Sequence, residues 1–436
     1  MAVTPGRRAA LAALRASGRG RRLDLALAQA ARKLDDRERR FAHELLFGTV
    51  RLRGRLDHLL AAQLDRPLDC LDAGVVDVLR LGAYQLLRME VPDYAAVSQA
   101  VELAPRRGAG LVNAVLRAVA KTGEDAARFP SRETDLAGWL STWGSHPRWL
   151  IDRWLARWPG EAVTELVRQD NEIPPLTLLP LRDDAERAIE LLAAEGLSAR
   201  AVGRGTRCVE LAPGSDPVQA LGALPAIVQD PGASLVIDAC VPRGASDPTG
   251  RSIGWAADLC AAPGGKALAL AARGWRVLAA DRSASRLRLL AENVARTGLP
   301  VVSVVALAEH PPVRGAAVVL ADVPCTGTGT LRRHPDARWR LQPGDPAALA
   351  AVQERILEGA AAAVAADGVL VYSTCTLESE ENEERIDVFL KRHPEFRLEP
   401  TDAVGPEHLD EGGRLAVRPW TSGFDGAFAA RLRKVG

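Results

Sequence analysis

The stretch Asp258-Leu-Cys-Ala-Ala-Pro-Gly-Gly-Lys266 lies between an apolar run, residues 253–257, and an apolar, alanine-rich segment, residues 267–272. This order predicts a strand, a glycine turn and a helix. Small residues and two glycines let the backbone approach a ligand closely, and the helix N-terminus points its N–H groups at that ligand. A turn of this kind suits a nucleotide-like cofactor.

Two common nucleotide-binding motifs are excluded. The spacing is not the G-x-x-x-x-G-K-[ST] of phosphate-binding loops, Ala267 offers no hydroxyl to magnesium, and the G-x-G-x-x-G of dehydrogenases is absent. Asp281 ends the next apolar run, 23 residues after Asp258, where doubly wound folds place an acid on a ribose hydroxyl. A nucleoside without phosphates fits best, and S-adenosylmethionine is the common one.

The composition is that of a globular protein, with 436 residues, 47% hydrophobic and 25% charged, which is enough length for about three domains. Net charge is +1, but residues 1–60 hold 14 Arg or Lys against 6 Asp or Glu. Such a local excess indicates nucleic-acid binding or a solvated helical face, and charge alone does not separate the two. No apolar run approaches the roughly 18 residues of a membrane span, so we expect a cytoplasmic protein without membrane contact.

Periodicity divides the chain into four predicted parts. Apolar residues recur every three or four positions through residues 1–128, which predicts an all-helical domain. Five tryptophans gather in residues 129–172, at spacings that favour a packed helical linker over base stacking. We expect a small α/β domain that contacts RNA at 173–245, and a mostly parallel, doubly wound sheet of the Rossmann-like kind at 246–436.

Six cysteines form no C-x-x-C pair, so the sequence indicates neither a metal site nor a disulfide framework. Cys70, Cys208 and Cys240 are interpreted as buried small apolar residues. Cys325 and Cys375 instead follow the fourth and fifth predicted strands, among turn-forming residues. Because functional groups gather at the carboxyl ends of parallel strands, the two thiols are predicted to face one pocket.

A methyl donor beside a thiolate points to methylation of a pyrimidine carbon. C5 of cytosine is not nucleophilic, so a thiolate must first add to C6, which makes C5 able to attack the methyl group. A base then removes the C5 proton and the thiol is eliminated. One cysteine serves the addition, and a second one serves the release.

Several motifs together resemble the Sun (RsmB) family of RNA 5-methylcytosine methyltransferases: residues 258–266, Asp322-Val-Pro-Cys-Thr-Gly-Thr-Gly329, Arg332-Arg-His-Pro-Asp336 and Tyr372-Ser-Thr-Cys-Thr376. The first 128 residues are similar to the RNA-binding domain of the NusB family, through segments such as Val112-Asn-Ala-Val-Leu-Arg117. The resemblance implies methylation of cytosine C5 in small-subunit ribosomal RNA, with S-adenosylmethionine as cofactor and no metal. It also leads us to expect a monomer.

The resemblance implies a role for each residue of the site. Cys375 is the expected nucleophile and Cys325 the release cysteine, whereas in DNA cytosine methyltransferases the cysteine of a Pro-Cys pair attacks. Asp281 is expected to hold the ribose, and Asp322 to lie near the methyl group and the base. The rest of the cofactor cradle is the loop of Cys260, Ala261, Ala262, Pro263, Gly264, Gly265 and Lys266.

One position departs from the family pattern. The third strand of the family commonly ends in Gly-Asp, whose carboxylate holds the adenine, whereas here residues 301–305 lead to Ala306-Leu-Ala-Glu309. Glu309 or a backbone group is the alternative that could hold the adenine in this chain. Two other functions stay open: an RNA-binding scaffold with a degenerate methyltransferase core, and an NAD(P) oxidoreductase that uses Arg282, which would explain neither cysteine.

Overall fold

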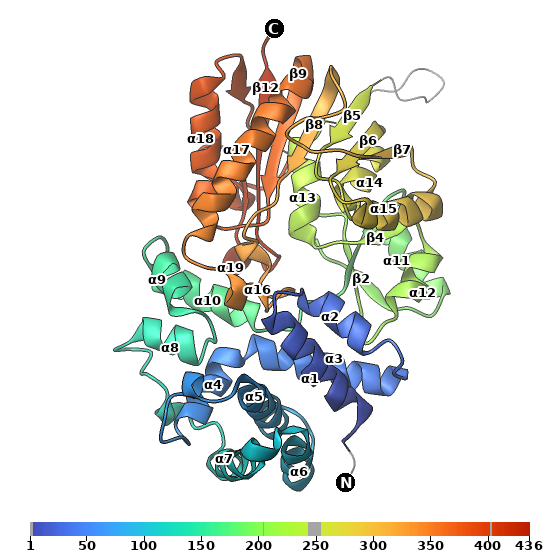
Figure 1. Ribbon diagram of the computed structural model, residues 1–436. Helices are drawn as coiled ribbons and strands as arrows, with labels where there is room; N and C mark the ends of the chain where they lie inside the picture. The colour runs from blue at the N-terminus through green and yellow to red at the C-terminus, as the bar shows by residue number, and fades with distance from the viewer. Residues whose placement is uncertain (1–2, 204, 243–253, 402) are drawn as a thin grey trace. The chain divides into compact units, whose positions relative to one another are not determined.

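The computed structural model describes residues 3–203, 205–242, 254–401 and 403–436. The chain divides into a helical unit, residues up to 173 together with 331–343, and a sheet unit, residues 174–330 and 344–436 (Figure 1). The side chain of Cys240, the predicted boundary at 245–246 and Ile253 lie outside the described part. Within that part, no helix is long and apolar enough to cross a membrane.

The helical unit confirms the predicted all-helical start of the chain. Asp35 caps the third helix by accepting a hydrogen bond from the backbone N–H of Glu38 (2.8 Å). Leucine, valine and alanine side chains form its core. Its helices are α1 (Pro5–Gly18), α2 (Leu23–Ala30), α3 (Asp36–Arg51), α4 (Arg53–Ala61), α5 (Ala73–Arg88), α6 (Asp93–Leu103), α7 (Ala109–Thr122), α8 (Leu136–Thr142), α9 (Arg148–Leu155), α10 (Gly160–Asp170) and α16 (Ala337–Arg340), with 3-10 turns η1 (Leu68–Cys70), η2 (Arg106–Gly108) and η3 (Ala126–Arg128).

Two of the predictions about packing can be compared directly with the helical unit. Trp154 of α9 is buried, as a packing role requires. Cys70 is exposed, so its interpretation as a buried residue is wrong. It ends the short turn η1, where too few side chains surround it, whereas Cys208 in the sheet unit is buried as expected.

Residues 331–343 belong to the helical unit, although their neighbours on both sides in the sequence lie in the sheet unit. Arg338 has no exposed surface, and its guanidinium donates to Asn171 Oδ1 (2.9 Å), Asp170 O (2.9 Å) and Ser145 O (3.1 Å). Burial lowers its pKa to about 10, which keeps it charged at neutral pH. The segment that sequence reasoning placed in the 246–436 domain is therefore anchored in the helical unit by a buried arginine.

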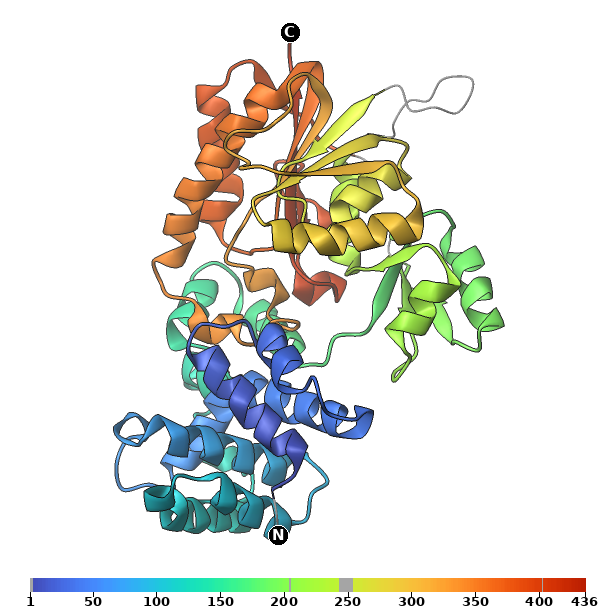
Figure 2. The same ribbon diagram turned by 45° about the vertical axis from the view of Figure 1, so that its right-hand side comes forward.

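The large sheet has strand order β10-β12-β9-β8-β5-β6-β7, with β11 paired to β12. Strands β9, β8, β5, β6 and β7 are parallel neighbours, which confirms the predicted doubly wound core. Helices α14 and α15 cover one face, and α17 and α18 cover the other (Figures 1 and 2). The strands are β5 (Trp255–Asp258), β6 (Arg276–Asp281), β7 (Val301–Val305), β8 (Ala316–Asp322), β9 (Val364–Thr374), β10 (Phe396–Leu398), β11 (Leu415–Val417) and β12 (Ala427–Lys434).

The following helices and turns belong to the same unit as this sheet. The helices are α13 (Pro231–Cys240), α14 (Gly265–Ala272), α15 (Ala284–Thr297), α17 (Asp345–Ala363), α18 (Glu383–Arg392) and α19 (Pro419–Ser422), with turns η4 (Thr328–Thr330), η5 (Ser379–Glu381) and η6 (Pro406–His408). Leu235, Val236 and Ile237 of α13 pack in the core of the large sheet. The end of the predicted small domain thus contributes a helix to the core of the large sheet.

The small domain is an antiparallel sheet of order β2-β3-β1-β4 with two helices, as the alternation of apolar runs predicts. Leu178, Val209 and Ala226 from three of its strands are buried together. Its elements are β1 (Thr177–Pro180), α11 (Ala185–Ala194), β2 (Ala199–Ala201), β3 (Val209–Leu211), α12 (Pro217–Ala223) and β4 (Ala226–Val228).

Replacement of Arg338 by lysine should destabilise the helical unit. A lysine ammonium keeps the charge but cannot reproduce the planar fork of donors, and each lost hydrogen bond to a charged group costs about 1.5–3 kcal/mol. Amide hydrogen exchange across residues 145–171 should therefore accelerate about tenfold or more. Arg340→Lys, at an exposed arginine of the same helix, should leave exchange unchanged; equal exchange in both variants would contradict the anchoring role.

Candidate active site

Parallel pairing of β8 with β9 places the two predicted thiols side by side. Asp322 lies opposite Ser373 in the register of these strands, and a thiol follows shortly after each position. The Sγ atoms of Cys325 and Cys375 are 3.4 Å apart, and the Cys375 N–H also donates to Cys325 Sγ (3.4 Å). Both side chains are half-buried. The predicted meeting of the two thiols is therefore observed.

Glycine at position 329 allows the two thiol loops to touch. The Gly329 N–H donates to the Cys375 carbonyl (3.0 Å), and its own carbonyl accepts from the Gly426 N–H (2.7 Å). A Cβ at 329 would lie 2.8 Å from that Cys375 oxygen and 2.7 Å from Gly426 Cα. Since neither backbone can give way without breaking these hydrogen bonds, any larger residue would push the loops apart.

The two thiols differ in acidity. A hydrogen bond from the Cys325 thiol lowers the pKa of Cys375, and the same interaction raises the pKa of Cys325 well above its usual range. The charge of Lys266 also lowers the pKa of Cys375, although burial and the Asp322 carboxylate oppose both effects. The thiolate is the nucleophilic form, and these interactions favour it at Cys375 more than at Cys325.

Lys266 joins the glycine turn to the strand that precedes Cys325. Its Nζ lies 2.8 Å from Asp322 Oδ2, and Asp322 Oδ1 accepts a hydrogen bond from the Ser373 hydroxyl (2.7 Å). Burial by itself lowers the pKa of Lys266, but the Asp322 carboxylate outweighs burial and the net shift is upward. The lysine therefore stays cationic beside the thiols.

Asp258 is a buried carboxyl group with one oxygen unused. Oδ1 accepts a hydrogen bond from the Cys260 N–H (3.3 Å), whereas Oδ2 has no hydrogen-bond partner among the described residues. Burial, followed by the charge of Asp322, raises its pKa to about 8. An opposite charge nearby would favour the ionised form, so this oxygen suits a cationic group of a ligand.

Asp281 holds the glycine turn from the neighbouring strand. Its Oδ2 accepts from the Ala262 N–H (3.1 Å) and its Oδ1 from the Ser283 N–H (2.8 Å). Gly264 has φ +117°, and a Cβ there would lie 2.5 Å from Leu290 Cδ1, so only glycine fits. The predicted cradle thus comprises the turn after β5 and the first two residues of α14: Cys260, Ala261, Ala262, Pro263, Gly264, Gly265 and Lys266.

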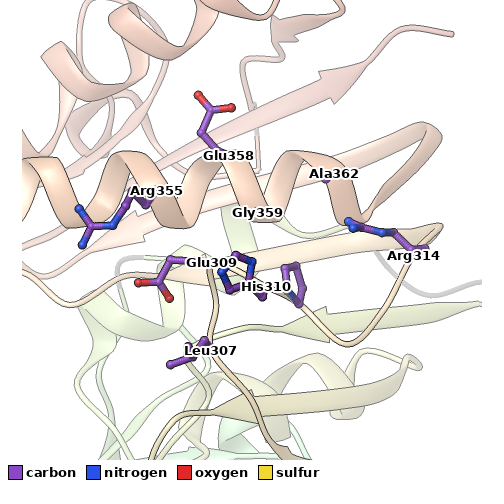
Figure 3. A pocket seen from close by; sticks show the side chains of 9 residues that line it. Leu307, Glu309, His310, Arg314, Arg355, Glu358, Gly359 and Ala362 are labelled. Carbon is purple, nitrogen blue, oxygen red and sulfur yellow. The ribbon is translucent and has the colours of Figure 1, made fainter.

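Glu309 lies on the loop after β7, the strand that lacks the terminal Gly-Asp of the family pattern in this chain. Burial and three aspartates raise the pKa of Cys260, and the charge of Glu309 adds to this. Glu309 also lines a pocket of about 610 Å³ between its loop and α17 (Figure 3). That pocket is lined by Leu307, Glu309, His310, Pro311, Arg314, Arg355, Glu358, Gly359 and Ala362, without a thiol.

Sequence reasoning missed the residues that hold the thiol loops. Ser373 binds Asp322, and the hydroxyl groups of Thr326 and Thr376 lie 2.6 Å apart. Buried Glu381 accepts hydrogen bonds from Thr326. Ser373 and Thr376 lie on either side of Cys375 in the same motif, and this proximity could have indicated their role. Glu381 belongs to the acidic run 378–384, and no sequence pattern distinguishes it from its neighbours.

Comparisons with known proteins agree with this arrangement. The family model described as 16S rRNA methyltransferase RsmB/F matches residues 251–433, the NusB family model matches 4–121, and an RsmF/B-like ferredoxin-like domain matches 146–216. The Mycobacterium tuberculosis protein Rv1407 is 38% identical over 459 residues, which cover 99% of this chain and 97% of the relative. The crystal structure of PH0851 is similar to this structure, with a TM-score of 0.76 at 24% sequence identity, and the match covers 100% of both chains. At this identity the similarity supports the fold alone.

A further relative is the ribosomal RNA small subunit methyltransferase B of Thermus thermophilus, which is 37% identical over 442 residues. The match covers 98% of this chain and 97% of the relative. Similarity of this degree extends through the helical start, the small domain and the thiol-bearing sheet. The chain belongs to the 16S rRNA methyltransferase RsmB/F family.

Proposed function

We propose that this protein uses S-adenosylmethionine to methylate C5 of cytosine in small-subunit ribosomal RNA, through a covalent adduct between Cys375 and C6 of the base. The observation that carries the proposal is the 3.4 Å contact between the two thiols that follow β8 and β9. The lowered pKa of Cys375 and the raised pKa of Cys325 support it. Membership of an rRNA methyltransferase family supports it, and the Thermus thermophilus relative is named for action on small-subunit ribosomal RNA. The presence of both thiols in contact argues against the alternative of an RNA-binding scaffold with a degenerate methyltransferase core.

S-adenosylmethionine fits the residues of the glycine turn, and when bound it supplies the methyl group. The unused oxygen of Asp258 suits a cationic group of that cofactor, and Asp281 at the next strand end suits a ribose hydroxyl. Asp322 adds a third carboxylate at the same edge. The glycine turn lacks the G-x-G-x-x-G that cradles a dinucleotide, and hydride transfer would use neither cysteine, which disfavours the oxidoreductase alternative.

The two cysteines have separate parts in the proposed reaction. Lys266 and the Cys325 thiol stabilise the Cys375 thiolate, which forms the bond to C6. Once that bond exists, Cys375 no longer carries a negative charge. One cause of the raised pKa of Cys325 is then removed, so Cys325 ionises more readily and can assist loss of the C5 proton and release of the product.

The helical unit is proposed to bind the RNA. Its first 60 residues carry the excess of 14 basic over 6 acidic residues, and residues 4–121 match the NusB family. Phosphate contacts release counterions, so binding by this unit should weaken steeply with salt. The small domain, within which part of the ferredoxin-like match falls, is proposed as a second RNA contact.

Single replacement of each thiol should give different products. Cys375→Ala has no nucleophile, so neither methylated RNA nor a covalent adduct should form. Cys325→Ala can still add and methylate but stalls before release, so a denaturant-resistant protein–RNA complex should accumulate. Denaturing gel electrophoresis with labelled small-subunit ribosomal RNA measures both outcomes.

The double variant Cys325→Ala/Cys375→Ala is the matched control and should lose the complex seen with Cys325→Ala. A complex formed by Cys375→Ala but not by Cys325→Ala would reverse the two roles. Absence of a complex from both single variants, with methylation intact in both, would exclude the thiol mechanism.

Cofactor binding should release a proton through Asp258. With a pKa of about 8, this carboxyl is mostly protonated at pH 7 in the free protein, and a bound cation favours its ionised form. Calorimetry in buffers of different ionisation enthalpy should therefore show release of about one proton per S-adenosylmethionine at pH 7. Affinity should rise between pH 6 and 7.5, because the free group ionises as the pH approaches 8.

Asp258→Asn should abolish the proton release. Asp281→Ala should lose about 1.5–3 kcal/mol of cofactor affinity, because a charged acceptor for the ribose is removed, yet keep the proton release. Buffer-independent enthalpies in the parent protein would show that Asp258 does not face a cation.

A further inference from the structure

A buried carboxylate holds the loop of Cys325. Glu381 ends η5, and its side chain has no exposed surface. Its Oε1 accepts hydrogen bonds from the Thr326 N–H (2.9 Å) and from Gln353 Nε2 (2.9 Å), and its Oε2 accepts from the Thr326 hydroxyl. Three donors converge on one group. An ionised carboxylate, which only accepts, satisfies all of them.

Gln353 of α17 completes the hold on Cys325. Its Nε2 also donates to the Pro324 carbonyl (3.0 Å), and its side-chain oxygen accepts from the Tyr372 hydroxyl (3.1 Å). Pro324 and Thr326 are the two chain neighbours of Cys325. Glu381 and Gln353, here called the clamp, therefore fix the backbone on both sides of this thiol.

The clamp also reaches the loop of Cys375 through hydroxyl groups. Thr326 Oγ1 lies 2.6 Å from Thr376 Oγ1, which in turn lies 3.0 Å from Thr328 Oγ1. Because the hydroxyl hydrogen of Thr326 is directed at Glu381, the Thr376 hydroxyl donates to Thr326. Thr376 directly follows Cys375, so each thiol has a chain neighbour bonded to the same small network.

We propose that Glu381 is a positioning residue whose carboxylate maintains the contact between Cys325 and Cys375; its catalytic consequence rests on the proposed function. Glu381 acts through Thr326 and Thr376, whose hydrogen bonds meet at its carboxylate. Its charge also contributes, after the contact with Cys375 and burial, to the raised pKa of Cys325. Loss of the carboxylate should therefore weaken the contact between the two thiols and make their pKa values more similar.

The test replaces Glu381 by glutamine, which keeps the size but turns one acceptor into a donor that faces other donors. In the parent protein, iodoacetamide should alkylate Cys375 from a lower pH than Cys325, with each site followed by mass spectrometry. In Glu381→Gln the two pH profiles should converge. Turnover on ribosomal RNA should fall about tenfold or more, because misplaced groups lose reactivity steeply, while the Kd for S-adenosylmethionine changes less than about twofold.

Glu380→Gln is the matched control, since it removes the same charge one residue earlier, and it should keep the parent profiles. Thr326→Val deletes a single hydroxyl of the network and should shift the profiles in the direction of Glu381→Gln, which keeps the proposal testable if that variant does not fold. Profiles unchanged in both variants would overturn the positioning role. Alkylation needs no RNA, so this result is independent of whether the proposed methylation is found.

Discussion

The pairing of β8 with β9 is the constraint on which the site depends. Both strands are buried, parallel and rich in Val, Leu and Ala, and their register sets Asp322 opposite Ser373. A shift by one residue would move a thiol about 3.3 Å along the strand and turn alternate side chains to the other face. The apolar interior thus brings the two thiol loops to one edge of the sheet, where hydrogen bonds join the loops to each other.

The chemistry at this edge depends on how its charged groups are paired. Asp258, Asp281 and Asp322 end three neighbouring strands, with Lys266 as the ion-pair partner of Asp322. Lysine is rare in this chain, with 5 among 56 basic residues, and an ammonium is a compact charge that can serve both a carboxylate and a thiolate. The unpartnered oxygen of Asp258 prepares the site for a cationic ligand, and the lysine favours the thiolate of Cys375.

Much of the site could be predicted from the sequence because strand ends are marked locally. Asp281 and Asp322 each close a short apolar run, and parallel topology then brings those ends together. Glu381 could not be found in this way, since its importance comes from burial beneath α17 and not from its neighbours in an acidic run. The anchoring of residues 331–343 in the helical unit was missed for a similar reason, because the burial of Arg338 depends on partners about 170 residues away. The C-terminal strands β10 to β12 were also missed, since they are short or interrupted by charged residues.

The central claim is that the more acidic of two touching thiols attacks the base. The most direct measurement is peptide mapping of the unmodified protein after reaction with S-adenosylmethionine and small-subunit ribosomal RNA transcribed with 5-fluorocytidine, whose fluorine cannot leave as a proton does. We expect a stable adduct of RNA on the peptide that contains Cys375. An adduct on the peptide that contains Cys325, with Cys375 free, would contradict it.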